Sequence, residues 1–534
     1  MLKGYLSIIL HAHLPYIRHP SFDDFMEEDW LFEAITETYM PLLESFEELH
    51  AQKIPFRLTM SISPTLCEMM SDTILKERYS RHLNRLIELA GKEVSNTAND
   101  GLFRDAAKMY YERFSRFREL YRHQYNHDLI KAFAKFQDLG YLEIITCAAT
   151  HGFLPLMLHK ESVRAQVITS VRNYHKHFAR APKGIWLPEC AYYPGLEEIL
   201  AEAGIKYFII DTHGVVNGNP PPLMDNYLPV YCSRSKVAAF ARDAQTSKQV
   251  WSAKEGYPGD ADYREFYRDL GYDAPYQYIK PFLHSDGLRR NVGIKYYRIT
   301  GDVQLHLKQP YQRHNALSKV ETHADNFIFY RQLQLSQHPS KLADTLPVIV
   351  APYDAELFGH WWFEGPDFIK AVIKRMALNS DIKLASPSDY LARHPKLQIS
   401  QPSYSSWGDG GYCKVWLNGK NDWFCRHLHK AETRMIEMAR QYNSSADAMQ
   451  EKALNQMARE LLLAQSSDWA FLITTQNSEC YAQNRFKTHI TRFNRLYDDI
   501  KHNHIDIEYI GNIQSEDNLF DEIDYRVYNP KMSS

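Results

Sequence analysis

The stretch Lys183-Gly184-Ile185-Trp186-Leu187-Pro188-Glu189-Cys190 decides the fold. Its β-type run, 183–187, ends close to the carboxylate of Glu189, just before a turn marked by Pro and Gly and a helical pattern. The same arrangement recurs downstream, where the apolar run 346–352 leads into Tyr353-Asp354, with Glu356 and His360 beyond. In an α/β barrel the C-terminal ends of the strands converge on the active site. Two strand-end carboxylates are the minimum machinery for glycosidic bond cleavage, whereas a single one is more often a salt-bridge or capping residue.

Other short apolar runs extend this pattern into a sheet. The runs lie at 5–11, 55–62, 142–149, 184–189, 205–211, 346–353 and 382–386. They are continuously apolar instead of alternating, which is typical of buried parallel strands, and helical patterns such as 30–49 and 162–177 lie between them. Strand–helix alternation predicts an α/β fold, and seven runs predict an incomplete seven-stranded (β/α) barrel. An open sheet is the alternative.

Interruptions of this strand–helix alternation predict the domain organisation. A catalytic barrel is expected over 1–400, followed by an all-α C-terminal domain over 401–525, with helical patterns at 422–441, 446–465 and 478–501. Within the barrel, two long charged amphipathic patterns, 75–92 and 103–137, predict an inserted helical hairpin over 73–138. The aromatic, Pro-rich region 212–300 predicts a loop-rich insertion of functional use. The last 20 residues are acidic and irregular, so a peripheral end with a tail at 526–534 is expected.

Composition excludes several classes of function. Net charge is −3 and the 62 basic residues are scattered, so no basic stripe indicates nucleic acid. No stretch approaches the length of a membrane span. Seven cysteines without a CxxC pair, and a first apolar run interrupted by His11 and His13, predict a cytoplasmic protein with free thiols and a core strand at its start. The 35 Tyr, 26 Phe and 9 Trp suit either a large core or the stacking of sugar rings.

The pair His11 and His13 ends the first predicted strand. Residues two apart on a strand point to the same side, so both imidazoles are expected to face one space at the barrel mouth. Such a pair can ligate zinc in amidohydrolases and deacetylases, with His151, His213 and Asp354 as further ligands. Alternatively, neutral histidines hydrogen-bond substrate hydroxyls and tune neighbouring carboxylates. The residues alone leave both interpretations open.

Five ordered motifs resemble glycoside hydrolase family 57, over roughly residues 1–525. They are His11-Ala12-His13-Leu14-Pro15-Tyr16, Cys147-Ala148-Ala149-Thr150-His151-Gly152-Phe153, Trp186-Leu187-Pro188-Glu189-Cys190-Ala191-Tyr192, Ala351-Pro352-Tyr353-Asp354-Ala355-Glu356-Leu357-Phe358-Gly359-His360-Trp361-Trp362, and Ser406-Trp407-Gly408 with Trp416-Leu417-Asn418. The resemblance is to the 1,4-α-glucan branching enzymes and the related amylase-like members.

The resemblance implies retaining chemistry on α-1,4-glucan without a metal or cofactor. Glu189 is then the nucleophile and Asp354 the general acid/base, with His11, His13 and His151 around the sugar at the cleavage point. A sugar 6-hydroxyl as acceptor gives an α-1,6 branch, and water gives hydrolysis. The alternatives are an α-amylase-like hydrolase of the same family, a zinc-dependent amidohydrolase or deacetylase, and a glucan-binding protein without activity. Oligomeric state and transferred chain length are not predicted.

Aromatic residues are expected to bind the glucan chain. Trp30, Trp407 and Trp416 match family positions that wall the groove, Trp251 matches a family segment without an assigned role, and Asp468 is expected to reach the groove or to pack. Of the adjacent Trp361 and Trp362, one is expected in the core.

The region 215–235 departs from the family pattern. Branching members carry a mobile loop there, with a tyrosine that keeps water from the intermediate. Where they read Tyr-Gly-Val-Tyr, this chain has Met224 at the first tyrosine position, and Tyr227 matches only the second. Transfer is therefore expected to be accompanied by more hydrolysis than in long-loop relatives.

Overall fold

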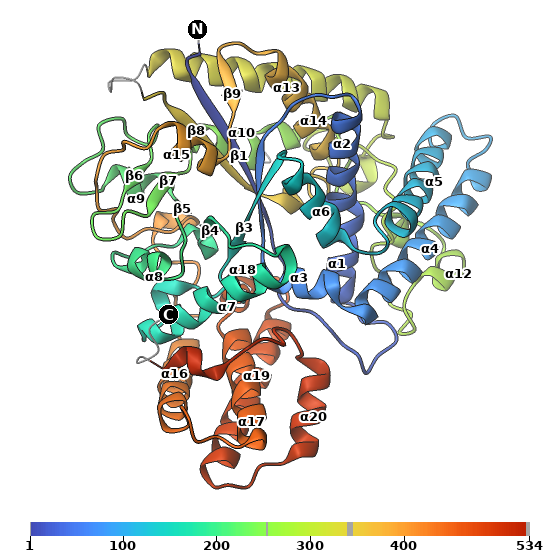
Figure 1. The fold of residues 1–534 in the computed structure, drawn as a ribbon. Coiled ribbons are helices and arrows are strands. Elements are labelled where there is room, and N and C mark those ends of the chain that lie inside the picture. The colour runs from blue at the N-terminus through green and yellow to red at the C-terminus, as the bar shows by residue number, and fades with distance from the viewer. Residues whose placement is uncertain (1, 253–254, 339–344, 530–534) are drawn as a thin grey trace.

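A curved, mainly parallel sheet forms the centre of the computed structural model, which describes residues 2–252, 255–338 and 345–529 (Figure 1). The order is β6-β7-β5-β4-β3-β2-β1-β8, with β9 paired to β1. The strands are β1 (Gly4–Ala12), β2 (Leu58–Ile62), β3 (Leu142–Cys147), β4 (Gly184–Trp186), β5 (Tyr207–Ile210), β6 (Val230–Tyr231), β7 (Ala238–Ala241), β8 (Val348–Asp354) and β9 (Ile382–Leu384).

Seven of these strands, from β7 across to β8, form a continuous parallel array. All nine residues of β1 are buried, as a strand covered on both faces requires. In the described part of the chain β7 and β8 share no ladder, and the amide of Asp243 donates to the Val350 carbonyl at 2.8 Å across the gap. The prediction of an incomplete seven-stranded barrel is confirmed.

Register brings the polar strand ends together. His11 on β1 is paired with Ser61 on β2 and with Asp354 on β8. On the other side of the barrel, Cys147 on β3 is paired with Trp186 on β4, three residues before Glu189. Side chains from β1, β2, β4 and β8 therefore meet at one edge of the sheet.

Long helices surround the sheet and build two projections from it. The helices of eight or more residues are α2 (Met40–Ala51), α3 (Pro64–Ser71), α4 (Thr73–Asn96), α5 (Arg104–Glu119), α6 (Leu129–Asp138), α7 (Lys160–Phe178), α10 (Ala244–Trp251), α13 (Arg313–Gln337), α14 (Gly365–Leu378), α16 (Trp423–Gln441), α17 (Ala448–Ala464), α18 (Ser467–Thr475), α19 (Glu479–Lys501) and α20 (Ile507–Glu516). Figure 1 shows the hairpin α4–α5 projecting from one side and α16–α20 grouped at one end of the barrel. No described helix is both long enough and apolar enough to cross a membrane.

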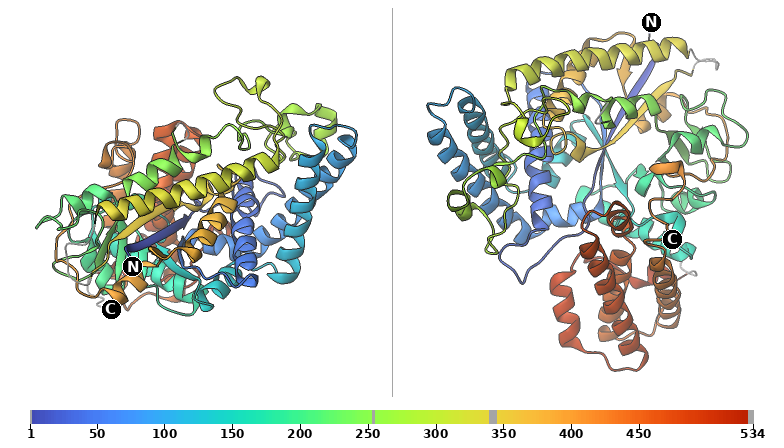
Figure 2. Two further views of the ribbon diagram at one scale, coloured as in Figure 1. Left: turned by 90° about the horizontal axis from the view of Figure 1, so that it is seen from above. Right: turned by 180° about the vertical axis from the view of Figure 1, so that it is seen from behind.

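The helical hairpin is shorter than the sequence pattern indicates. The run 103–137 is divided into α5, a π-turn at Leu120–Gln124 and α6, and the N-cap of α6 is the Asp128 carboxylate, which accepts from the Lys131 amide. In both views of Figure 2 the segment following α10 lies against the hairpin. There the Tyr110 hydroxyl donates to the Lys295 carbonyl.

Two local expectations were wrong. The region 212–300 was expected to be a loop-rich insertion, but β7 lies within it and pairs with β5 as part of the central sheet. The chain end was expected to be peripheral, but Phe520, Tyr525 and Tyr528 are fully buried. Aromatic side chains dock this acidic segment on α7 and α16, because their burial outweighs the cost of ordering it. Residues 530–534 of the expected tail lie outside the described residues.

Candidate active site

A cavity of about 690 Å³ opens where the strand ends meet. Its lining contains all of the predicted site residues except Trp30, namely His11, His13, His151, Glu189, Asp354, Trp407, Trp416 and Asp468. Arg242, Trp251, Glu356 and Phe471 line it as well. The barrel supplies the acids and histidines, while Asp468 and Phe471 come from α18. The cavity is thus formed jointly by the barrel and the helical domain.

Glu189 lies in a short, tightly wound turn, Pro188–Cys190, directly after β4. Both Glu189 (φ 62°) and Cys190 (φ 50°) have left-handed backbone conformations, and so does His151 (φ 57°). Such conformations are unfavourable for residues with a Cβ and are concentrated at functional sites. The turn points Glu189 into the cavity, where its exposed fraction is 9%.

Two hydrogen bonds hold the Glu189 carboxylate. The Trp407 indole Nε1 donates to one oxygen at 2.6 Å, and the Ser467 hydroxyl donates to the other at 2.9 Å. Burial raises the pKa of Glu189 to about 7, and the Trp407 hydrogen bond, Asp468 and the Ser467 hydrogen bond are the next contributions, of which both hydrogen bonds lower it. These donors favour the charged form of Glu189 against the effect of burial.

Ser467 also connects Glu189 to the histidines. Its oxygen lies 2.8 Å from His151 Nδ1, and because its proton is donated to Glu189, His151 Nδ1 must be the donor. The Nε2 atoms of His151 and His11 lie 3.0 Å apart, and His11 Nδ1 lies 3.1 Å from the Ser61 hydroxyl. Burial lowers the pKa of both His11 and His151 well below the ordinary value. A chain of neutral groups therefore runs from Ser61 to the carboxylate of Glu189.

Asp354 has the opposite environment at the end of β8. Within the described ranges its carboxyl group accepts no hydrogen bond, in contrast to Glu189. Burial raises the pKa of Asp354 well above the ordinary value, Glu356 and Glu189 raise it further, and Arg242 lowers it. Like charges nearby favour the neutral acid. Hydrogen bonds thus favour an ionised Glu189, whereas neighbouring charges favour a protonated Asp354.

His13 pairs with the helical domain. Its Nε2 lies 3.1 Å from an Asp468 oxygen and its Nδ1 lies 2.9 Å from the Ser63 hydroxyl. Burial opposes ionisation of Asp468, but His13 outweighs it and the pKa of Asp468 is lowered to about 2. Of the two alternatives that the sequence left open for Asp468, groove or packing, the structure places it in the cavity lining.

The zinc-ligand set proposed from sequence is not assembled. His213 lies away from the cavity lining, with Nδ1 3.2 Å from Asp211 and Nε2 2.8 Å from the Gly411 carbonyl. Among the described residues, three other sets of donor atoms lie within 4.8 Å of one another: His11 with Cys147 and His151, His13 with His151 and Asp468, and Glu460 with His489 and Asp517.

The aromatic residues divide between groove and core. Trp407, Trp416 and Trp251 line the cavity, and the rings of Trp251 and Trp407 meet edge to face at 6.1 Å. Trp30 is not among the lining residues and packs edge-on against Tyr481 at 5.5 Å. The expectation that Trp30 walls this part of the groove is therefore not met.

The structure also places the adjacent Trp361 and Trp362, and Tyr227 of the region 215–235. Trp362 is 1% exposed and belongs to the core, as expected of one of the pair, while Trp361 is 53% exposed. Tyr227 is 8% exposed, stacks on His338 and accepts a hydrogen bond from Gln334. Tyr227 therefore does not serve as a tyrosine over the active site.

Sequence reasoning did not assign four residues of the site. Ser467 binds Glu189, Arg242 lines the cavity near Asp354, Glu356 lies beside Asp354, and the Trp186 ring stacks on His11 at 4.5 Å. Glu356 and Trp186 lie inside quoted motifs, and Ser467 directly precedes Asp468, so position in a motif was the available signal. Arg242 follows an alanine-rich strand, and no sequence motif marked it as a site residue.

Comparison with known proteins agrees with this architecture. A family model described as glycosyl hydrolase family 57 matches residues 7–402, and a second, described as 1,4-alpha-glucan branching enzyme, C-terminal, matches residues 427–528. A 1,4-alpha-glucan branching enzyme of Thermococcus kodakarensis, TK1436, is 34% identical over 97% of this chain and 78% of the relative. The chain belongs to glycosyl hydrolase family 57.

Two solved structures are similar over nearly the whole chain. The alpha-amylase AmyC from Thermotoga maritima is 46% identical with a TM-score of 0.93, covering 99% of this chain and 100% of that one. The branching enzyme TK1436, in complex with glucose, is 32% identical with a TM-score of 0.89, covering 100% of this chain and 98% of that one. Relatives with two different activities therefore share this fold.

Proposed function

We propose that this protein is a 1,4-α-glucan branching enzyme that works by retaining double displacement. The observation that carries the proposal is the pair of acids, Glu189 and Asp354, in one cavity with opposite environments. A nucleophile must be ionised and a general acid protonated, and environments that separate two carboxyl groups in this way are how such roles are divided. The branching-type C-terminal match, whose domain contributes to the cavity, supports branching in particular.

The reaction then follows in two steps. Glu189 attacks the anomeric carbon, the bond from that carbon to the leaving 4-oxygen breaks, and Asp354 donates its proton to that oxygen. In the second step Asp354 takes the proton of an acceptor 6-hydroxyl, the new oxygen bonds to the anomeric carbon, and Glu189 is released as carboxylate. The product is an α-1,6 branch with unchanged anomeric configuration.

His13 and Asp468 supply a fixed polar pair beside these acids, and Trp407 and Trp416 supply ring faces for the chain. A stacked ring contributes about 0.5–1.5 kcal/mol beyond burial, enough for several to retain a glucan segment. The polymer made would be glycogen-like. The seven cysteines, none of which forms a disulfide, suit a reducing compartment such as the cytoplasm.

Hydrolysis like that of an α-amylase is the second candidate. Its support is the 46% identity to the alpha-amylase AmyC, together with the burial of Tyr227, which keeps this residue from acting as the tyrosine of long-loop branching members. Transfer wins over water only when the acceptor is positioned or water is kept out. A mixed outcome is therefore expected, with branches formed and reducing ends released.

The test is incubation with amylose, with new α-1,6 linkages and new reducing ends counted in the same samples. Branch formation with a measurable excess of reducing ends is the expected result. Reducing ends without branches would replace the branching proposal by the amylase alternative. Almost no reducing-end release beside efficient branching would show that the argument from Tyr227 is wrong.

A further inference from the structure

The segment that follows Asp354 is fastened to a widened turn of the first helix. This π-turn, η1 (Ile35–Tyr39), lies between α1 (Glu28–Ala34) and α2. The hydroxyl of Tyr39 donates a short hydrogen bond to Glu356 Oε1, and the amide of His13 donates to the same oxygen at 3.3 Å. Insertions of this kind in helices occur frequently at functional sites.

A second attachment lies four residues further along the same segment. His360 Nδ1 lies 2.7 Å from a Glu37 oxygen, and Arg264 lies 3.6 Å from the other oxygen of Glu37. Between the two attachments, Gly359 (φ +121°) packs so closely that an added Cβ would lie 1.8 Å from the Glu37 carbonyl. Contacts at Glu356, Gly359 and His360 therefore fix the segment on the π-turn.

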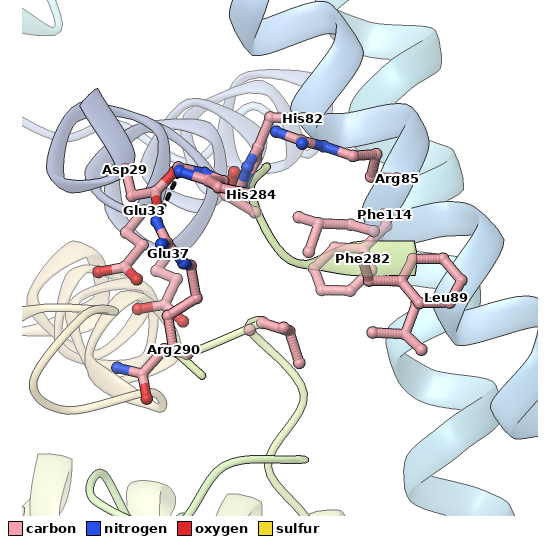
Figure 3. A pocket seen from close by; sticks show the side chains of 15 residues that line it. Asp29, Glu33, Glu37, His82, Arg85, Leu89, Phe114, Phe282, His284 and Arg290 are labelled. Atoms are coloured by element: carbon pink, nitrogen blue, oxygen red, sulfur yellow. Dashed lines mark hydrogen bonds and ion pairs between the residues drawn. The ribbon is translucent and has the colours of Figure 1, made fainter. Parts of the chain in front are cut away.

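Figure 3 shows the other side of this contact, where Glu37 lies beside Glu33 and Asp29 in the wall of a smaller cavity of about 40 Å³. Asp29 is paired with His284 at 3.2 Å. Glu33 has no hydrogen bond or ion pair with any residue of the described ranges, and none with the segment after Asp354. Glu37 is thus the acid of this wall that contacts that segment.

We propose that Glu356 is a positioning residue for Asp354, held in place by Tyr39 of the π-turn and by the His13 amide. The proposal rests on the proposed function, because it concerns how Asp354 serves as acid/base. Glu356 lines the active-site cavity two residues from Asp354, and both of these hydrogen bonds go to one of its two oxygens. In its ionised form it adds a negative charge where the general acid must hold its proton; burial raises the pKa of Glu356, and the hydrogen bonds from Tyr39 and the His13 amide oppose that rise.

The charges around both groups support this role. Asp354 is faced by Glu356, Glu189, Arg242 and Asp468; burial raises its pKa first, and Glu356 is the next contribution in the same direction. Glu356 itself is faced by Tyr39 and His13. Burial, Glu356 and Asp354 all raise the pKa of Tyr39 well above its ordinary value, so Tyr39 remains a donor.

Two substitutions separate charge from geometry. Glu356→Gln keeps an oxygen that accepts from Tyr39 and His13 but removes the charge. The kcat for amylose cleavage should fall about 10- to 100-fold with little change in KM. The descending limb of the pH profile should move about one unit toward lower pH, because loss of a like charge lowers the pKa of Asp354. Tyr39→Phe keeps the charge but removes its donor, so kcat should fall about 3- to 10-fold without movement of the limb.

Glu33→Gln is the matched control, since it removes a neighbouring carboxylate that acts on His360 through its charge but is not among the groups that shift the pKa of Asp354, and it should leave both kcat and the limb unchanged. A second readout is the initial burst of fluoride released from α-maltosyl fluoride, a leaving group that needs little protonation. If Glu356 acts through Asp354, the deficit of Glu356→Gln should shrink at least tenfold with this donor.

Equal deficits on both donors, or a wild-type profile for a folded Glu356→Gln variant, would overturn the proposal. If Glu356→Gln does not fold, wild-type kcat in Tyr39→Phe would overturn it equally. Asp354→Asn is measured in parallel. A fully active Asp354→Asn variant removes the proposed function itself, whereas an inactive one beside wild-type behaviour of Glu356→Gln removes only the role of Glu356.

Discussion

Replacement of Ser467 by alanine tests how the nucleophile is held. Ser467 is 2% exposed and donates one of the two hydrogen bonds to Glu189, so the change removes that donor and, with it, the acceptor of His151 Nδ1. A hydrogen bond to a charged group contributes about 1.5–3 kcal/mol. Since one pKa unit corresponds to about 1.4 kcal/mol, its loss should raise the pKa of Glu189 from about 7 by roughly one to two units.

The sign of this shift makes the effect depend on pH. Glu189 must be ionised to attack, so the ascending limb of kcat/KM for amylose should have a midpoint near pH 7 in the natural protein. In Ser467→Ala the limb should move to higher pH by the same one to two units. At pH values below the midpoints of both ascending limbs, kcat/KM of the variant should be about 10- to 100-fold lower than that of the natural protein. At pH values above both midpoints this deficit should largely disappear.

Two controls accompany the measurement. Ser467→Thr keeps a hydroxyl and should retain the position of the limb. Thr475→Ala lies on the same helix, where the exposed Thr475 hydroxyl bonds only to backbone carbonyls of its own helix, and should behave as wild type. A limb that stays in place, or a loss of equal size at every pH, would refute the claim that Ser467 stabilises the ionised nucleophile.

Three further outcomes are expected. Glu189→Gln and Asp354→Asn should each lower turnover by about three orders of magnitude or more with unchanged circular dichroism, because nucleophile and acid/base act as a unit; full activity in either contradicts the assignment. EDTA should leave turnover unchanged and purified protein should hold well under one zinc per chain, whereas stoichiometric zinc whose removal abolishes turnover would favour the amidohydrolase alternative. Trp416→Ala should raise KM for amylose about 2- to 10-fold with little change in kcat, as loss of a stacking ring predicts, and an unchanged KM would place Trp416 outside the binding surface.

The central strands were predictable from sequence because their apolar runs are continuous. Strand β7 was missed for a physical reason: its residues, Ala238-Ala239-Phe240-Ala241, are mostly alanine, which has low strand propensity. Its position is set by pairing with β5, a tertiary effect that local sequence does not report. The chain end was misjudged because its acidic residues outnumber the few aromatic side chains, Tyr525 and Tyr528 among them, that bury it.

The acids of the site were predictable for a different reason. Asp354 is the last residue of β8 and Glu189 follows the end of β4 by three residues. Because the C-terminal strand ends of a parallel barrel converge, acids at these positions are expected to lie close together. No comparable sequence pattern predicts the role of Ser467, which lies 278 positions from Glu189 in the sequence and yet donates a hydrogen bond to it. Nor does sequence show that Trp30 packs on Tyr481 while Trp251 lines the cavity, since both are tryptophans next to helical patterns.

The helical domain completes the catalytic centre. The Ser467 amide donates to the His151 carbonyl at 3.1 Å, and its hydroxyl lies between His151 and Glu189. Asp468, next on the same helix, pairs with His13. Without α18 the Glu189 carboxylate would keep only the Trp407 hydrogen bond, and His13 would lose its anionic partner. The two residues act on Glu189 in opposite directions, because the Asp468 charge raises the pKa of Glu189 while the Ser467 hydrogen bond lowers it. Docking of α18 therefore supplies both a hydrogen-bond donor and a neighbouring charge to the nucleophile.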